Sequence, residues 1–383
     1  MRLFKVYILL SLIFQINCFS QAGLNKKNSN NISYKEYQGK ILDVDSKEEL
    51  AFANISVLNS NISTISNING EFSIKIPENY KPNIKVSFIG YTSKVVDLNK
   101  VKKKKKIILL DVYSIPLSEM ILSIPKDVEN LVKKALFNSQ NNYINENLLM
   151  TSFFRESIKR RRRNVSLTEA VSKIYKAPYK NSTRDIIEFI KLRKNTDYSR
   201  LDTLTVKLAG GPFNTLFLDI IKYPNSFIPK ANIALYSYVI KRTTRVNNKP
   251  VYVVGFKQKE GVYLPSIQGE LYIDVSDLII ISANFNLNTT NQELIKNLFV
   301  VTKPKKANVW PIQAKYKVDY TEKHGKWVFN YSNLLLQLKI NYDKKLFNTS
   351  YSFSSEIAVT DWAIDNKRIL PKNKMRVKPK IIL

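Results

Sequence analysis

The residues that could carry chemistry in this chain are few. There is one histidine, His324, and one cysteine, Cys18, among 383 residues. A zinc site needs several His, Cys or carboxylate ligands at fixed spacing, which this pair cannot supply. No Gly-x-Ser-x-Gly nucleophile sequence accompanies the histidine, and Glu322-Lys323-His324-Gly325 is typical of a hairpin turn. The sequence therefore predicts no metal, no cofactor and no nucleophilic catalysis.

Carboxylates offer another route to chemistry, because a pair of them can hydrolyse a glycosidic bond without histidine. The candidates are Glu156, Glu169, Asp274 and Asp277. Asp274 and Asp277 flank an expected turn, where Asp side chains commonly accept backbone N–H groups. We expect structural roles for these carboxylates and keep a carboxylate-based glycoside hydrolase as an alternative function.

The N-terminus has the pattern of a Sec signal peptide over residues 1–22. Arg2 and Lys5 precede an apolar run that is too short to span a bilayer, and Ala22 supplies a small residue for cleavage. The residues before Cys18 do not match a lipoprotein signal, so we expect no lipid anchor there. Cleavage after Ala22 leaves no cysteine, which excludes disulfide-linked partners. Residues 23–33 are polar and Asn-rich, as in a linker.

The formal net charge is +30, from 61 basic and 31 acidic residues. In an exported protein this charge favours anionic envelope surfaces and lipid headgroups rather than nucleic acid. Enrichment of Lys and Asn by an AT-rich coding sequence is an alternative cause. One dense basic cluster is predicted to contact anionic surfaces, unless it is only a solvated loop tip: Lys159, Arg160, Arg161, Arg162 and Arg163.

Residues 34–123 contain short runs with β-branched or aromatic residues at alternate positions, separated by turn formers. Asn69-Gly70 in particular predicts a hairpin turn of type I′. The run resembles the carboxypeptidase-regulatory-like domain of secreted and outer-membrane proteins of the Bacteroidetes type. The matching positions are Gly39, Asp43, Ala53, Ile55, Asn69-Gly70-Glu71-Phe72 and Phe88-Ile89-Gly90-Tyr91. The resemblance implies a prealbumin-like, seven-stranded-type β-sandwich and says little about activity.

Residues 124–383 predict a larger β-rich domain. Residues 127–143 have a helical period, and helical pieces are also expected near 181–191 and 214–223. Most of the remainder alternates as strands do, which predicts a mainly β (α+β) fold with a curved antiparallel sheet or half-barrel and a helix against its concave face. Residues 269–280 resemble a strand pair of periplasmic lipoprotein-carrier half-barrels.

Aromatic residues recur along the expected strands of this domain. A half-barrel with an apolar concavity could shelter an acyl chain, although such residues more commonly fill a core. The predicted ligand-binding residues are Phe153, Tyr175, Tyr236, Tyr238 and Phe256.

Together these observations predict a non-enzymatic, exported cell-envelope protein of the periplasm or outer membrane. Its β-rich domain is expected to bind a hydrophobic or envelope-derived ligand, such as a lipid, or an envelope protein. A second alternative is an outer-membrane β-barrel with a periplasmic sandwich domain.

Overall fold

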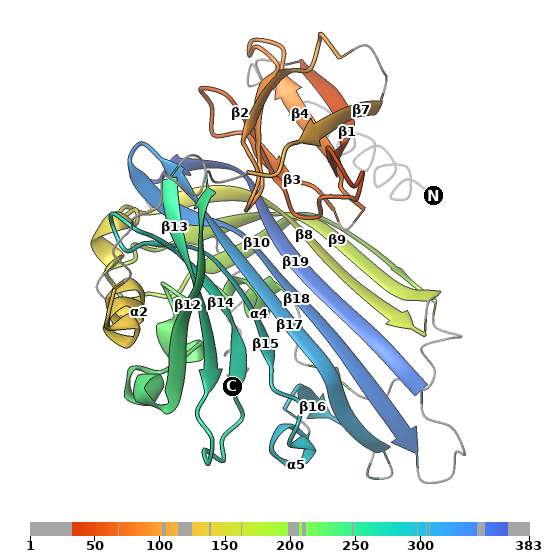
Figure 1. Ribbon diagram of the computed structural model, residues 1–383. Coiled ribbons are helices and arrows are strands. Elements are labelled where there is room, and N and C mark those ends of the chain that lie inside the picture. Colours follow the sequence, from red (N-terminus) through yellow and green to blue (C-terminus); the bar gives the residue numbers. More distant parts are fainter. Residues whose placement is uncertain are drawn as a thin grey trace, which may run out of the picture.

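The computed structural model describes residues 33–67, 69–101, 105–113, 125–137, 139–161, 163–197, 207–208, 212–246, 249–296, 298–303, 305, 307–342 and 349–366. The expected signal peptide with Cys18, most of the expected linker and Arg162 lie outside these residues. Two modules built from strands make up the described chain: a small sandwich and one large curved sheet (Figure 1).

The sandwich consists of two sheets that share one apolar core. One sheet has the order β4-β1-β7, from β1 (Tyr34–Asp43), β4 (Glu71–Pro77) and β7 (Lys105–Leu110). The other has the order β3-β2-β5-β6, from β2 (Asn54–Val57), β3 (Ser63–Ile65), β5 (Asn83–Ser87) and β6 (Lys94–Asp97). Alternate residues such as Ile41, Ile55 and Ile84 are fully buried between the sheets. The predicted seven-stranded sandwich is confirmed.

The Asn69-Gly70 turn differs from the prediction. It leads from β3 to β4, which belong to different sheets, so it is not the tip of a hairpin. The side-chain oxygen of Asn67 accepts the N–H groups of Asn69 and Glu71 and shapes this crossing. Gly70 has φ +70°, and its carbonyl accepts the N–H of Ile41. Asn69 and Gly70 suit both a hairpin turn and a turn that crosses between two sheets. Which of the two forms depends on the strands with which the flanking residues pair.

The large sheet has ten antiparallel strands in the order β10-β9-β8-β19-β18-β17-β15-β14-β13-β12. Their bounds are β8 (Leu148–Arg160), β9 (Arg163–Lys176), β10 (Ile186–Thr196), β12 (Tyr236–Val246), β13 (Lys249–Gln258), β14 (Ile267–Asp274), β15 (Ile280–Leu287), β17 (Ala307–Lys323), β18 (Lys326–Tyr342) and β19 (Thr349–Ile364). A separate pair is formed by β11 (Lys207–Leu208) and β16 (Val300–Thr302). The predicted curved antiparallel sheet is confirmed. The helical piece expected at 181–191 is wrong, because β10 occupies most of it.

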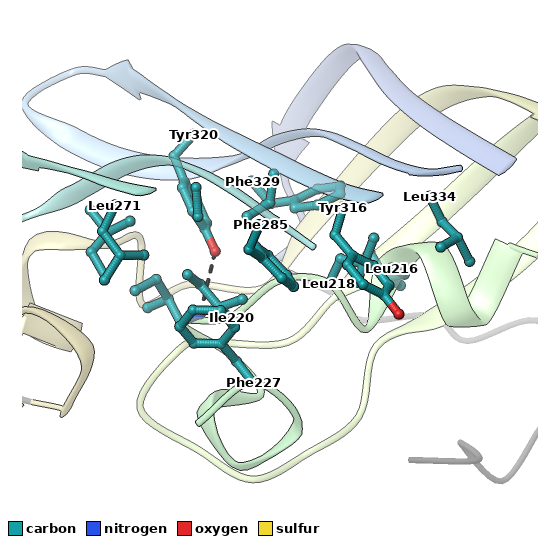
Figure 2. Packing of buried hydrophobic residues seen from close by; sticks show 14 of the residues in the cluster. Leu216, Leu218, Ile220, Phe227, Leu271, Phe285, Tyr316, Tyr320, Phe329 and Leu334 are labelled. Carbon is teal, nitrogen blue, oxygen red and sulfur yellow. Dashed lines mark hydrogen bonds between the residues drawn. The ribbon is translucent and has the colours of Figure 1, made fainter. Parts of the chain in front are cut away.

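We call the face of the large sheet that carries Met150, Phe154 and Ile174 the inner face. The short helices and turns between 212 and 235 pack against it: α4 (Pro212–Leu216), η3 (Pro224–Ser226) and η4 (Lys230–Leu235). Figure 2 shows their apolar side chains, including Ile220 and Phe227, against residues of the sheet. The inner face is therefore covered by the chain itself.

The expected helix at 127–143 is α2 (Val128–Phe137), followed by the 3₁₀ turn η2 (Ser139–Asn142). It contacts β12 and η4 near one edge of the sheet, and it buries the apolar stripe that the sequence predicted. The last helix within the described residues is α5 (Gln292–Ile295). Among the described residues, no helix has the length and apolar character needed to cross a bilayer.

Candidate functional site

The sandwich sits on the opposite, outer face of the large sheet, at one end of β18 and β19 (Figure 1). Asn61 donates to the carbonyl of Trp362 at 2.8 Å, and the Ser63 hydroxyl donates to the carbonyl of Val359 at 3.1 Å. The rings of Phe52 and Tyr331 lie 5.5 Å apart. These contacts join residues about 300 positions apart and fix one module against the other.

A cleft of about 1000 Å³ opens between the two modules. The sandwich contributes one wall from β1, β3 and β4, and the outer face of β8, β9 and β19 contributes the other. Apolar groups such as Phe72, Phe153 and Val171 line it together with charged side chains. An open cleft with apolar walls and converging polar groups is the usual form of a binding site.

An ion cluster lies on the large-sheet wall of this cleft. Arg155 donates to Oε1 of Glu169 from Nε at 3.0 Å and from Nη2 at 2.8 Å, and Arg193 binds Oε2 of the same carboxylate. Burial alone raises the pKa of Glu169, but the hydrogen bonds from the two guanidinium groups outweigh it and hold the pKa below its ordinary value. Glu169 is therefore charged and neutralised in place.

Two other carboxylates in the cleft are less well compensated. Burial raises the pKa of Glu356, although Arg155 at 3.9 Å and a 3.0 Å hydrogen bond from the Tyr331 hydroxyl act against it. Burial also raises the pKa of Asp361, although the backbone N–H of Trp362 donates a hydrogen bond to its carboxylate. A partly desolvated carboxylate is stabilised by an added cation, so both groups favour a ligand with positive charge.

The charge of the cleft opposes that of the chain. Five acidic and three basic side chains line it, whereas the whole chain carries +30. The acidic ones are Glu36, Glu71, Glu169, Glu356 and Asp361, and the basic ones are Lys75, Arg155 and Arg193.

The five aromatic residues predicted to bind a ligand do not form one surface. Phe153 lies on the outer face in the cleft, with the Arg155 guanidinium 5.6 Å from its ring centre. Tyr175 lies on β9, the strand next to that of Phe153, and its hydroxyl donates to the Glu188 carboxylate. Tyr236 and Phe256 lie in the core on the inner face, their ring centres 6.2 Å apart, and Tyr238 packs beside them. Tyr238 and Phe256 also line a second groove of about 600 Å³ on β12–β15.

The basic cluster predicted to contact anionic surfaces forms the tip of the β8–β9 hairpin. Lys159, Arg161 and Arg163 are exposed there, Arg160 is half-buried, and Arg160 pairs with Arg163 across the ladder. The tip lies five residues beyond Arg155 along β8, outside the cleft. Contact of this cluster with an anionic surface stays a prediction.

The other candidates for chemistry are placed apart. Glu156 neighbours Arg155 on β8 and so points away from the face that carries Glu169. Asp274 accepts the N–H groups of Ser276 and Asp277, the capping role expected for that turn. His324 lies in the β17–β18 turn with φ 51°. In the part of the chain that the structure describes, no group of three His, Cys, Asp or Glu side chains could hold a metal ion.

A buried ion triad at the inner face was not predicted. Lys176 Nζ lies 2.7 Å from Oδ2 of Asp185 and 2.7 Å from Oδ2 of Asp219, and all three side chains are at most 1% exposed. The hydroxyls of Tyr179 and Tyr320 donate to Asp219 at 3.1 and 2.9 Å. Burial lowers the pKa of Lys176, but the two carboxylates outweigh it and raise the pKa. One lysine faces two carboxylates, and these also accept hydrogen bonds from the Ala177 N–H and from the Tyr179 and Tyr320 hydroxyls, so we assign the triad a structural role.

Comparison with known proteins gives one domain assignment. Residues 37–122 match the CarboxypepD_reg-like domain. This range agrees with the resemblance read from Gly39, Asp43 and Tyr91. None of the curated proteins compared with the chain matches it.

Three solved structures share a distant likeness with most of the chain. A DUF1329 family protein from Desulfovibrio piger has 10% identity and a TM-score of 0.24, covering 62% of this chain and 92% of that one. A LolA superfamily protein from Nitrosomonas europaea has 10% identity and a TM-score of 0.21, covering 63% and 94%. Lipovitellin, in a structure of lipid–protein interactions, has 7% identity and a TM-score of 0.30, covering 61% of this chain and 27% of that one. These three matches are distant, and no ligand or activity is carried over from them to this chain.

Proposed function

We propose that this chain is an exported, non-enzymatic protein of the cell envelope that binds a partner protein in the cleft between its two modules. The observation that carries the proposal is the contrast between the two faces of the large sheet. The chain's own segment 212–235 covers the inner face, whereas the outer face opens into the cleft. Export itself is supported by the pattern of residues 1–22.

The chemistry of the cleft indicates the kind of partner. Carboxylates whose pKa values are raised by burial, Glu356 and Asp361, favour a cationic group beside them. Phe72, Phe153 and Val171 offer apolar contact at the same place. A polypeptide segment that carries both basic and apolar side chains satisfies both requirements, and a purely apolar lipid satisfies only the second.

Site-specific photocrosslinking in intact cells tests the proposal. A benzophenone amino acid replaces Val171, which is 40% exposed in the cleft, or Val95, which is 60% exposed on β6 away from it. We expect protease-sensitive adducts with another protein from position 171 alone, weakened by Glu356→Gln with Asp361→Asn. Equal adducts from both positions, or adducts made only of lipid or glycan, would contradict it.

One observation favours a second candidate, a carboxylate-based hydrolase. The pKa of Glu169 is lowered and that of Glu356 is raised, and both carboxylates contact Arg155 in one cleft. In hydrolases that use two carboxylates, the pKa values of the acid and the base are shifted in opposite directions in this way. Hydrolysis of an envelope glycan that is lost in both Glu169→Gln and Glu356→Gln would favour this candidate over binding alone.

A further inference from the structure

The strand β4 brings the edge of a sheet to the cleft. It is the last strand of its sheet: it pairs with β1 on one side, and no described strand pairs with its other side. Its residues from Glu71 to Lys75 line the cleft. A sheet edge that opens into a binding cleft can take up one more strand from another protein.

The hydrogen bonds of the β1–β4 ladder show which backbone groups of β4 point away from β1. The Glu78 N–H donates to the Ser33 carbonyl where the ladder ends. In an antiparallel pair such bonds recur at every second residue, so the even-numbered residues between 72 and 76 bond to β1. The N–H and carbonyl groups of Ser73 and Lys75 therefore point to the side on which no described strand lies.

The strand β3 also brings an edge to the cleft, but this edge is short and already held. It has only three residues, Ser63–Ile65, and its Ser63 hydroxyl bonds to the Val359 carbonyl of β19. Edge strands that are short or covered are protected from pairing. Because β4 has seven residues, it is the one of these two strands that has room for an added strand.

The charged side chains of the cleft favour one kind of strand at this edge. Apart from Glu169 and its two arginines, four acidic side chains and one basic side chain, Lys75, line the cleft. Two of the acidic ones, Glu36 and Glu71, lie on the sandwich. Opposite charges on neighbouring strands attract and like charges repel, so an added strand with basic side chains fits better than one with acidic side chains.

The two sides of β4 differ, and an added strand continues both of them. Phe72 and Ile74 are buried toward the sandwich core, whereas Ser73 and Lys75 point outward and are exposed. In an antiparallel addition, the residues that bond to Ser73 and Lys75 carry their side chains on this outward side, where Glu71 also lies. The residues between them continue the apolar side. The strand that fits therefore alternates basic and apolar residues.

We infer that the partner protein binds by adding an extended segment of alternating basic and apolar residues to β4 as an antiparallel strand. This inference rests on the proposed function, because it concerns the same cleft, and it adds the binding mode and the chemistry of the partner segment. The main-chain hydrogen bonds to Ser73 and Lys75 supply affinity, and the alternation of side chains supplies specificity.

Amide hydrogen exchange of the purified full chain tests the added strand. The probe is a synthetic peptide in which lysine and valine alternate over about eight positions. We expect the Ser73 and Lys75 amides to exchange at least about tenfold more slowly with the peptide than without it. The Ile74 amide, which bonds to β1, is the internal control and should be protected in both states. Slow exchange of Ser73 and Lys75 before the peptide is added, or no slowing afterwards, would overturn the inference.

Two N-methylated forms of the peptide separate strand addition from charge attraction. Methylation of the lysine nitrogens removes the N–H groups that bond to β4, whereas methylation of the valine nitrogens removes N–H groups that point away from it. In fluorescence anisotropy, we expect the lysine-methylated peptide to bind at least about tenfold more weakly than the valine-methylated one. The two peptides carry the same charge, so equal binding would overturn strand addition. Equally tight binding of a peptide that alternates glutamate and valine would overturn the assigned charge.

A proline substitution on β4 tests the same edge with the natural partner in intact cells. Ser73→Pro removes an N–H that points away from β1 and so keeps the ladder, and circular dichroism of the purified variant checks its fold. By the same alternation, the Val95 N–H on β6 points away from β5, so Val95→Pro is the matched control outside the cleft. We expect the protein adducts from position 171 to fall at least about tenfold in Ser73→Pro and to persist in Val95→Pro.

Failure of this inference is distinguishable from failure of the proposed function. Protein adducts from position 171 that persist unchanged in Ser73→Pro overturn strand addition and leave the proposed function standing. If position 171 captures no protein in the unsubstituted background either, the proposed function fails, and the inference that rests on it fails too.

Discussion

The Tyr91 hydroxyl donates a 2.7 Å hydrogen bond to Oδ2 of Asp43. Both residues belong to the set by which the sequence resembled the CarboxypepD_reg-like domain, and the structure gives the pairing a physical reason. The other oxygen of Asp43 accepts the N–H groups of Asp45 and Ser46, both at 2.7 Å, and closes the turn after β1. The turn after β1 is thus tied to the loop that carries Tyr91, 48 positions along the chain.

The first prediction concerns acid stability. The hydrogen bond from Tyr91 and those from the backbone N–H groups lower the pKa of Asp43 to about 2 from its usual 3.8. Because the folded-state pKa is lowered, this contribution to stability is complete above the unfolded-state pKa and is lost as the pH falls toward 2. We expect Asp43→Asn to flatten the fall of unfolding free energy between pH 5 and pH 2 in urea titrations. An unchanged slope in the variant would contradict this assignment.

The second prediction compares two glycines whose φ angles are both positive. Gly70 has φ +70° and Gly90 has φ +84°, so alanine is strained at either position. An added Cβ at Gly70 would lie 2.6 Å from the Ile41 carbonyl oxygen, whereas at Gly90 it would meet nothing within 4 Å. We expect Gly90→Ala to lower the unfolding free energy by about 1 kcal/mol and Gly70→Ala by clearly more. Equal losses in denaturant titrations would show that the Gly70 clash is relieved by movement.

The strands were predictable because their signal is local. Buried and exposed residues alternate along Thr349–Ile364, and the sequence shows this as alternating apolar and polar residue types. The segment 181–191 misled because Ile186, Ile187 and Ile190 have spacing that a helix also allows. Pairing of Ile187 with Ile174 on β9 determines the strand.

The cleft could not be predicted in the same way. It depends on contacts such as Ser63 with Val359, which bring a sandwich edge onto the outer face of the large sheet. Glu356 was not a candidate, because its contacts with Tyr331 and Arg155 join three different strands, β19, β18 and β8. Nothing in the local sequence of Lys176 or Asp219 indicates that they meet in the core.

The third prediction concerns Glu356, a half-buried carboxylate of the cleft. Burial raises the pKa of Glu356, so its contribution to stability is present below about pH 4.5 and is lost as the pH rises through the folded-state value. Glu356→Gln removes this dependence. We expect the difference in unfolding free energy to move in favour of the variant between pH 4 and pH 7, by up to about 1.4 kcal/mol for each pKa unit. Glu260→Gln, the same substitution on an exposed turn, is the matched control variant.

The fourth prediction concerns the ion triad at the inner face. Lys176→Met would leave the carboxylates of Asp185 and Asp219 buried without their cation, and removing one partner of a buried ion pair costs about 3–5 kcal/mol. Lys173→Met, three positions earlier on β9 and half-buried on the outer face, should cost much less. Urea titration of the two variants measures the contrast.

A second substitution tests whether the loss in Lys176→Met comes from charge rather than from packing. Asp185→Asn added to it removes one of the two uncompensated carboxylates, while Asp219 keeps its hydrogen bonds from Tyr179 and Tyr320. The double variant should therefore be more stable than Lys176→Met alone, because each uncompensated charge left in the core is unfavourable. If the second substitution lowers stability further, the loss comes from packing around the lysine stem, and the triad is not held by its charges.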